Sequence, residues 1–320
     1  MDNNFSAYYN RAVAIQNEIK KVVLGKDEII EKILATTLAG GHVLLDDIPG
    51  VGKTTLALAF SYATSMDYRR MQFTPDVLPT DVTGFSIYDK KTDSFQYKPG
   101  VAICNLFLAD EINRTSSKTQ SALLEIMEEG KVTVDGINHK LPSPYVVIAT
   151  QNPIGSVGTQ MLPDSQLDRF MVCVSMGYPS RQDEVEILKG RRNTNPLDSV
   201  VAVATKEDII AMRNIVNEIY TDDKIYEYIA AIADETRNND MFKLGLSPRG
   251  SLALARAARA VAFLHGRDYV IPDDVVFIFH DVAAHRVVLS PKAKISGASN
   301  QQILEDVLKK VPAPRLSKHE

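Results

Sequence analysis

The sequence predicts an α/β fold, with a parallel sheet and a phosphate-binding loop, followed by a smaller all-α domain. Three observations support this prediction. Residues 49–55, Pro-Gly-Val-Gly-Lys-Thr-Thr, lie between a short apolar run and a helical pattern. Further short apolar runs and helical patterns follow up to about residue 180, which is typical of a doubly wound parallel sheet. Beyond that point the strand signals disappear and helical spacing remains.

Length and composition set the limits of this prediction. The chain has 320 residues, more than one domain usually contains, so we expect two domains. The formal net charge is −4 and basic residues occur in nothing longer than pairs, so we expect no nucleic-acid partner. Cys104 and Cys173 lie in apolar runs without metal-ligand spacing, which favours buried thiols over a metal site or disulfide. Without a signal-peptide pattern or an apolar run of about 18 residues, we expect a cytoplasmic protein and no membrane insertion.

The N-terminal part predicts two helices and a buried strand. Residues 5–39 have helical spacing, with a break at residues 24–26, and Gly40-Gly41 ends the second helix. Residues 43–46 form a short, nearly continuous apolar run, which is typical of a strand covered on both faces. Helical spacing resumes after the loop and continues to about residue 66. Strand, loop and helix therefore occur in the order that a phosphate-binding loop requires.

The loop has the residue types that anion binding needs. Gly50 and Gly52 let the backbone bend until several N–H groups point at one phosphate. Lys53 adds a positive charge, and Thr54 adds the hydroxyl that such loops place on Mg²⁺. Asp47 departs from the strict pattern, which has glycine at that position. A polar turn before a helix is the alternative interpretation of these residues taken alone.

The rest of the first domain predicts more strands, two hairpins and two helices. The hairpins are expected at residues 85–97 and 132–139, the second around Asp135-Gly136. We expect a helix at residues 116–129 and a short helix that ends at residues 167–169. The remaining core strands are expected at residues 69–73, 106–109, 145–149 and 171–174.

Three strands end in polar groups that suggest a hydrolytic site. Asp46 leads into the loop, Asp110-Glu111 follows the run at residues 106–109, and Gln151-Asn152 follows the run at residues 145–149. The carboxyl ends of parallel strands share one edge, so we expect these groups to meet there. Asp110 would hold Mg²⁺ with Thr54, Glu111 would activate water, and Asn152 would bind the water or the γ-phosphate. The alternative for the acid pair is a solvated strand end.

The second domain is predicted to be helical, with the boundary in residues 191–196. Arg249 follows Ser247-Pro248, a residue pair typical of a helix start. A cation in a first helical turn opposes the helix dipole at a cost of about 0.3 to 1 kcal/mol, which is easier to understand if Arg249 faces a phosphate. An ordinary surface arginine remains the alternative. Helices are expected at residues 184–189, 206–220, 223–237, 248–264, 272–284 and 301–310.

In kind and order, these motifs resemble those of MoxR-type AAA+ ATPases of the helix-2-insert clade. The resemblance implies a P-loop NTPase core with a three-layer αβα arrangement at residues 1–192 and a helical lid at residues 193–320. The two hairpins match the inserts of that clade, which face a ring pore or partners. The segments that carry the resemblance are residues 43–55, 72–79, 81–84, 110–114, 119–125, 149–153, 167–170 and 247–249.

The resemblance also implies roles for individual residues at the nucleotide. Asp110 and Glu111 would be the Walker B acids and Asn152 the first sensor. Val23 and Gly25 match a segment that lies near the adenine. The residues that would bind the phosphates of ATP are Pro49, Gly50, Val51, Gly52, Lys53, Thr54 and Thr55.

Two arginines would act at a distance from that loop. By resemblance, Arg169 would be an arginine finger that reaches the nucleotide of a neighbouring subunit, which implies a ring and usually a hexamer. From the residues alone, Leu-Asp-Arg-Phe at 167–170 could equally be a helix end. Arg249 would be the second sensor on the lid, reporting the γ-phosphate to the helical domain.

The function expected from this resemblance is Mg²⁺-dependent ATP hydrolysis by a ring-forming chaperone or remodelling protein. Such proteins commonly act with partners that carry a von Willebrand factor A domain. One alternative is a nucleotide-controlled binding switch with slow hydrolysis. Others are a magnesium-chelatase-like subunit and a DNA-translocating helicase, of which the helicase is disfavoured because basic runs are missing.

Overall fold

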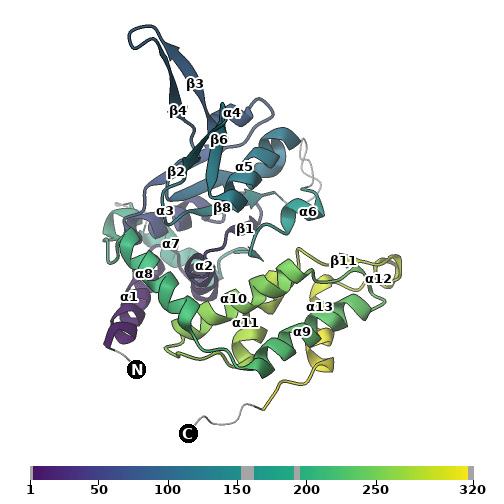
Figure 1. The fold of residues 1–320 in the computed structure, drawn as a ribbon. Helices are drawn as coiled ribbons and strands as arrows, with labels where there is room; N and C mark the ends of the chain where they lie inside the picture. The colour runs from purple at the N-terminus through teal and green to yellow at the C-terminus, as the bar shows by residue number, and fades with distance from the viewer. Residues whose placement is uncertain (1–2, 153–161, 191–194, 316–320) are drawn as a thin grey trace.

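The computed structural model describes residues 3–152, 162–190 and 195–315, and its centre is the predicted parallel sheet (Figure 1). Five strands pair in parallel in the order β2-β5-β8-β1-β9. β5 is completely buried, as its apolar sequence predicts. The strands are β1 (Val43–Asp46), β2 (Tyr68–Gln72), β5 (Leu106–Asp110), β8 (Val146–Gln151) and β9 (Val172–Val174).

Helices cover both faces of this sheet, which makes the predicted three layers. Successive side chains of a strand point to opposite faces, so Val43 and Leu45 pack into one apolar cluster and Leu44 into another. The first cluster includes α1 (Asn3–Lys20), α2 (Asp27–Leu38) and α3 (Lys53–Thr64), and the second includes α5 (Ser117–Glu129). The α/β fold class predicted from the sequence is confirmed.

Both predicted hairpins are present, and one extends from the core in Figure 1. The two hairpins contact each other, since the Tyr97 ring of the first stacks on the His139 ring of the second with centroids 3.8 Å apart. A helix that the sequence did not indicate precedes the first hairpin: α4 (Pro79–Thr83) is a single turn in which the Leu78 N–H donates to Asp81. The hairpin strands are β3 (Gly84–Asp89), β4 (Ser94–Pro99), β6 (Lys131–Val134) and β7 (Ile137–Lys140).

The C-terminal part is helical, and it also contains one short antiparallel strand pair that helical spacing does not indicate. That pair is β10 (Phe242–Leu244) and β11 (Val288–Leu289). The boundary was predicted in residues 191–196, with the division between residues 192 and 193, and that division lies outside the described residues, so it stays a prediction. The helices from the predicted boundary region onward are α7 (Arg181–Gly190), α8 (Lys206–Glu218), α9 (Asp223–Asn238), α10 (Pro248–Leu264), α11 (Pro272–Ala283), α12 (Pro291–Ser296) and α13 (Asn300–Lys310).

Three further short elements connect parts of the fold. η1 (Ile112–Arg114) follows β5, α6 (Asp164–Leu167) precedes β9, and η2 (Pro196–Ser199) precedes α8. The two parts of the molecule share an apolar cluster, because α8 and α10 pack on α1 and α2. No helix within the described ranges is both long and apolar enough to span a bilayer.

Candidate functional site

The loop between β1 and α3 has the backbone shape that an anion cradle requires. Gly50 and Gly52 adopt φ values of +86° and +99°, in the region where an L side chain is strained. A Cβ atom on Gly50 would meet nothing within 4 Å, so backbone conformation, and not space, calls for glycine there. Gly52 is also the N-cap of α3, so the first N–H groups of that helix open toward the loop.

The contacts of the Asp47 side chain explain why aspartate, and not the glycine of the strict loop pattern, occupies position 47. Its buried carboxylate accepts hydrogen bonds from the Ser175 hydroxyl at 3.0 Å, the Gly177 N–H at 3.1 Å and the Met176 N–H. These donors follow β9, about 130 residues away in the chain. A glycine at position 47 would leave them unpaired. The side chain therefore anchors the phosphate loop to the segment after β9.

Lys53 is directed into the same loop. Its ammonium group donates to the Asp47 carbonyl at 2.7 Å and to the Ile48 carbonyl at 3.3 Å. Burial lowers the pKa of Lys53, while the nearby carboxylates of Asp47, Asp110 and Glu111 act in the opposite direction. A buried cation held by carbonyl groups, beside open helix N–H groups, fits a polyphosphate.

A cavity of about 820 Å³ adjoins the loop, which is within the usual size of a ligand pocket. Val23 lines it together with Gly50 and Gly52. Gly25 has a φ of +67°, and a Cβ atom there would lie 2.1 Å from the Asp183 carboxylate, so it shapes the turn beside the cavity. Other lining residues are Val22, Leu24, Pro49, Val51, Thr55, Met176, Tyr178 and Ile187.

The two predicted acids have distinct surroundings at the end of β5. The Asp110 carboxylate accepts from the Thr150 hydroxyl at 2.6 Å and from Arg70 at 2.7 Å. The Thr150 hydroxyl also accepts from the Glu111 N–H at 2.8 Å, so β8 holds both acids. The Glu111 carboxylate accepts from Arg114 at 2.8 Å.

The backbone of Glu111 is strained, with φ at +56°. Such a conformation costs about 1 to 3 kcal/mol and is found most often at functional sites. Here it turns the chain sharply after β5, so that Asp110 and Glu111 face different partners. Strain at one of two adjacent acids supports a chemical role over a solvated strand end.

Asn152 is brought to the same edge through Asn113. The buried Asn113 side chain accepts from the Asn152 N–H at 3.3 Å and donates to the Asn152 carbonyl at 3.2 Å. Asn113 belongs to η1, directly after Glu111, so the acid and the predicted first sensor are fixed to each other. The register of β1 and β8 places Asp46 beside Gln151. All three predicted strand ends therefore meet.

The donor set at this edge fits a divalent metal bound together with phosphates. Mg²⁺ prefers oxygen ligands and commonly takes one or two from the protein, with the rest from phosphates and water. Asp110 and Thr54 would supply such oxygens. Within the described residues no group of three or more His, Cys, Asp or Glu side chains could hold a metal ion alone.

Arg169 and Arg249 lie together, but away from the phosphate loop. Both guanidinium groups pair with Glu128, Arg169 with Oε2 at 3.3 Å and Arg249 with Oε1. They line a cavity of about 450 Å³ that Gly41 and Met171 also line. Those two residues precede β1 and β9, whereas the phosphate loop follows β1. The two arginines are therefore at the opposite edge of the sheet from the loop.

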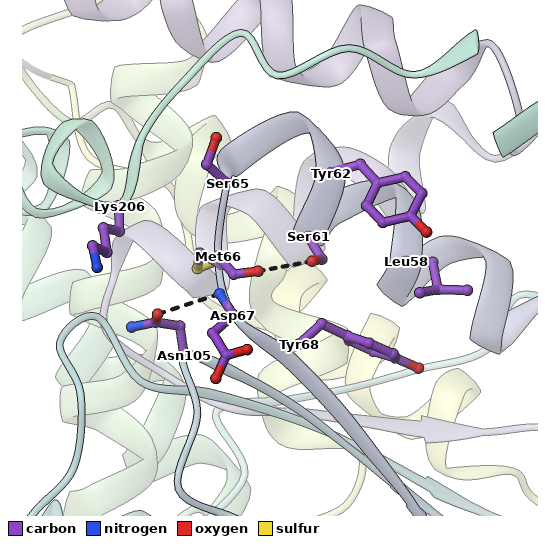
Figure 2. A pocket seen from close by; sticks show the side chains of 9 residues that line it. All are labelled: Leu58, Ser61, Tyr62, Ser65, Met66, Asp67, Tyr68, Asn105 and Lys206. Carbon is purple, nitrogen blue, oxygen red and sulfur yellow. Dashed lines mark hydrogen bonds between the residues drawn. The ribbon is translucent and has the colours of Figure 1, made fainter. Parts of the chain in front are cut away.

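Another depression, of about 680 Å³, lies at the end of α3 beside β2 (Figure 2). In it the Ser61 hydroxyl donates to the Met66 carbonyl, and Asn105 accepts from the Asp67 N–H. It contains none of the predicted site residues.

Sequence reasoning missed the supporting residues of the site. The contacts of Glu128, Thr150 and Asn113 join residues about 40 or more positions apart, which local spacing does not reveal. For Asn113 a signal was available, because it belongs to the segment 110–114 that carries the family resemblance.

The comparisons with known proteins agree with this geometry. The family model for the ATPase family associated with various cellular activities (AAA) matches residues 42–172, and the AAA lid domain model matches residues 234–307. The chain is 49% identical over 92% of its length to an uncharacterized protein, YeaC, of Bacillus subtilis, covering 92% of that protein. It is 37% identical over 94% of its length to Chaperone MoxR1 of Mycobacterium tuberculosis, covering 81% of it.

A crystal structure of a Cytophaga hutchinsonii protein matches with a TM-score of 0.90 and 35% identity, covering 98% of this chain and 97% of the other. A magnesium-chelatase subunit homologue of Methanocaldococcus jannaschii is less similar, at 27% identity over 61% of this chain. The chelatase alternative is therefore disfavoured. Because the AAA family model matches and Chaperone MoxR1 is 37% identical over 94% of this sequence, the chain belongs to the MoxR-type AAA+ ATPases.

Proposed function

We propose that this protein hydrolyses ATP with Mg²⁺ as a ring of identical subunits, with each nucleotide bound between two neighbours. The observation that carries the proposal is the position of Arg169 and Arg249 at the sheet edge opposite their own phosphate loop. β1 alone, at about 3.3 Å per residue, separates the two edges by roughly 13 Å. A cation must approach within about 3 Å of a phosphate oxygen to stabilise its charge.

The two arginines therefore serve a neighbouring subunit. One face of each subunit would present the phosphate loop and the other would present Arg169 and Arg249. A head-to-tail contact between two different faces of identical chains closes into a ring when the rotation allows it, and we propose six subunits. The resemblance to ring-forming AAA+ proteins supports that number.

The reaction follows from the residues at the loop edge. The loop N–H groups and Lys53 bind the phosphates, and Glu111 accepts a proton from the attacking water. Asn152 orients that water or the γ-phosphate. Bound Mg²⁺, held by Thr54 and Asp110, would neutralise charge on the phosphate oxygens. Arg169 of the neighbour would stabilise the charge that builds up as the bond breaks.

Glu128 would control when the two arginines become free to bind a neighbouring nucleotide. Its carboxylate holds Arg169 and Arg249 in the same chain, so both guanidinium groups must leave Glu128 before they bind the neighbour's phosphate. Each half-exposed ion pair contributes only about 0.2 to 1 kcal/mol, which a buried phosphate contact readily exceeds. Binding of ATP would thus draw the lid and the next core together.

The work done by the ring is proposed to be remodelling of protein partners in the cytoplasm. Similarity over 94% of this chain to a protein named Chaperone MoxR1 supports this, and we propose partners with a von Willebrand factor A domain. The β3–β4 hairpin exposes Phe95 by 74% and Phe85 by 45%, and such aromatic surface is suited to a protein contact. Movement of the hairpin on ATP binding and hydrolysis would change its contact with the partner.

A binding switch with slow hydrolysis is the second candidate, and one contact favours it. Arg114 donates to the Glu111 carboxylate at 2.8 Å, so the acid must leave this partner before it can act on a water molecule. A motor and a switch would differ in turnover: only the motor needs repeated hydrolysis to act on its partner.

Mixing two variants tests whether the arginines act across the interface. Arg169→Ala keeps its own nucleotide site, and Glu111→Gln keeps its arginines. Each variant alone should lose hydrolysis, by about 10³-fold for the arginine. Mixed one to one, they should recover about one quarter of the wild-type rate, because that fraction of sites has both an intact acid and an intact neighbour. A mixture that stays inactive would contradict action between subunits.

A further inference from the structure

We propose that Arg286 and Asp168 form a clamp that positions Arg169 and Arg249 as a single unit. The inference rests on the proposed action of these arginines across the subunit interface. Arg286 and Asp168 touch neither phosphate nor water in this scheme. They are positioning residues, and their contacts explain how two cations from separate parts of the fold reach one nucleotide together.

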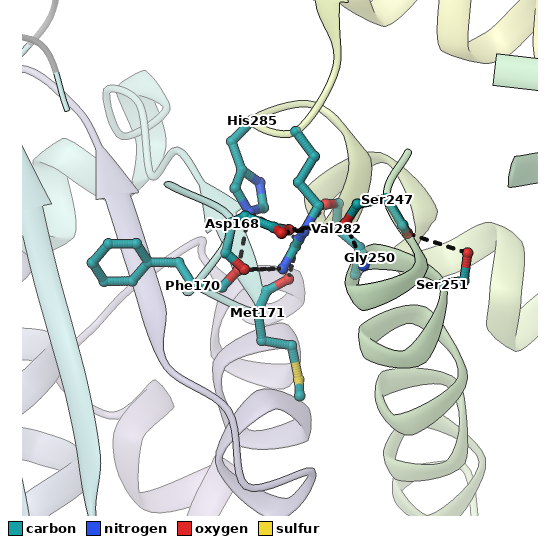
Figure 3. Close-up of polar contacts among 9 residues, drawn as sticks. Asp168, Phe170, Met171, Ser247, Gly250, Ser251, Val282 and His285 are labelled. Atoms are coloured by element: carbon teal, nitrogen blue, oxygen red, sulfur yellow. Dashed lines mark hydrogen bonds and ion pairs between the residues drawn. The ribbon is translucent and has the colours of Figure 1, made fainter. Parts of the chain in front are cut away.

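The Arg286 guanidinium binds the main chain on both sides of Arg169, at the carbonyl groups of Asp168 and Phe170, which Figure 3 labels. Its Nη2 donates to the Asp168 carbonyl at 3.1 Å and to the Phe170 carbonyl at 2.6 Å. Its Nη1 donates to the Met171 carbonyl at 3.0 Å. The residue is 5% exposed, so solvent offers no alternative partners. The segment that carries the finger is thereby fixed from α6 to the start of β9.

The Asp168 carboxylate joins this segment to the helix that carries Arg249. It accepts from Arg286 Nε at 2.7 Å and from the Ser247 hydroxyl at 3.2 Å. Ser247 is the N-cap of α10, and its oxygen also accepts from the Gly250 N–H at 3.1 Å. Arg249 lies between these two anchors, in the first turn. One carboxylate therefore holds both arginine-bearing segments.

The residues that pack around the clamp leave space for the side chain of Arg286. A Cβ atom on Gly250 would lie 2.5 Å from Leu246 and 3.0 Å from the Arg286 side chain, so glycine leaves room for the stem of Arg286. The His285 ring nitrogen also approaches the Phe170 carbonyl at 3.0 Å. A buried ion pair adds little to stability compared with a well-packed apolar contact. Here the directional hydrogen bonds of the Arg286–Asp168 pair fix the positions of the segments that carry Arg169 and Arg249.

Fixed geometry is what an arginine acting across an interface needs. A displacement of about 1 Å at a catalytic group can lower the rate by about 100-fold. Arg169 and Arg249 have long side chains and half-exposed heads, so their accuracy depends on the main chain that carries them. The clamp supplies that accuracy, and because it joins core and helical parts, it makes both cations move together.

The test uses Arg286→Lys in the full-length chain. Lysine keeps the positive charge beside Asp168, but a single ammonium nitrogen cannot replace the three guanidinium nitrogens that bind the Asp168 carboxylate and the carbonyl groups together. We expect unchanged affinity for a fluorescent ATP analogue and a kcat about tenfold lower. Mixed one to one with Glu111→Gln, it should recover about one quarter of the wild-type rate, since the neighbour supplies an intact clamp. Asp168→Asn, which keeps the shape, is the second variant.

Parallel mixtures separate the possible failures. If Arg169→Ala recovers activity with Glu111→Gln but both clamp variants do not, the clamp is overturned and action across the interface stands. If none of the three recovers, action across the interface fails, and the clamp fails with it. A wild-type kcat in both clamp variants would also overturn the clamp. Recovery by all three supports it.

Discussion

Asp47→Gly restores the strict phosphate-loop pattern, yet the structure predicts that it damages the protein. The Asp47 carboxylate accepts three hydrogen bonds from the segment after β9, two of them from the main-chain N–H groups of Met176 and Gly177. Glycine accepts none of these, and it adds freedom to the unfolded chain.

The loss of stability can be estimated from those hydrogen bonds. A hydrogen bond to an ionised acceptor contributes about 1.5 to 3 kcal/mol, and an unpaired buried N–H costs about 1 to 3 kcal/mol. These terms overlap, so we expect the free energy of unfolding to fall by about 3 to 5 kcal/mol. For a chain of 320 residues this lowers Tm by about 5 to 7 °C. ATP affinity should fall about tenfold, because the loop must be ordered on binding.

The assay is thermal unfolding together with titration of a fluorescent ATP analogue. Ser175→Ala is the graded control, since it removes one of the three donors and should cost about 1 kcal/mol, or 1 to 2 °C. Equal Tm and equal affinity for Asp47→Gly and the wild type would refute the anchoring role of the carboxylate. Glycine at position 47, as in the strict loop pattern, would then serve this site as well as aspartate does.

Three further predictions follow from other contacts. Burial lowers the pKa of His42 to about 4 from an ordinary 6.5, so its contribution to stability is present above pH 6.5 and is lost as pH falls to 4. Between these two pH values the free energy of unfolding in urea should fall by about 3 kcal/mol in the wild type, and His42→Gln should lack this loss. Glu128→Gln should raise hydrolysis at limiting protein concentration up to about fivefold, because two ion pairs no longer compete with the nucleotide, and a slower enzyme would contradict this. Arg114→Ala should raise kcat about two- to fivefold by releasing Glu111, and an unchanged steady-state rate would show that this pair does not restrain the acid.

The elements with strong local signals could be predicted from the sequence. The strands β1, β5, β8 and β9 are apolar runs, and the loop glycines require positive φ, so both features were predicted close to their observed positions. The acids and Asn152 were expected at one edge because parallel strands share their carboxyl ends, and they meet there.

What the sequence could not show depends on distant contacts or on very short elements. The strands β10 and β11 have three and two residues, too few for a visible alternation. The role of the Asp47 side chain depends on donors about 130 positions away. The shared position of Arg169 and Arg249 depends on how the helical part packs against the amino ends of the strands, which no local pattern contains.

If a neighbouring subunit completes each nucleotide site, the protein must assemble, and light scattering measures its molar mass directly. Wild type and Glu111→Gln should be measured with and without ATP and Mg²⁺, Glu111→Gln because it should keep ATP bound. We expect a ring of about six subunits that depends on nucleotide and is most stable in Glu111→Gln. A monomer of 35.4 kDa under every condition would contradict it, because Arg169 and Arg249 would then have no nucleotide within reach.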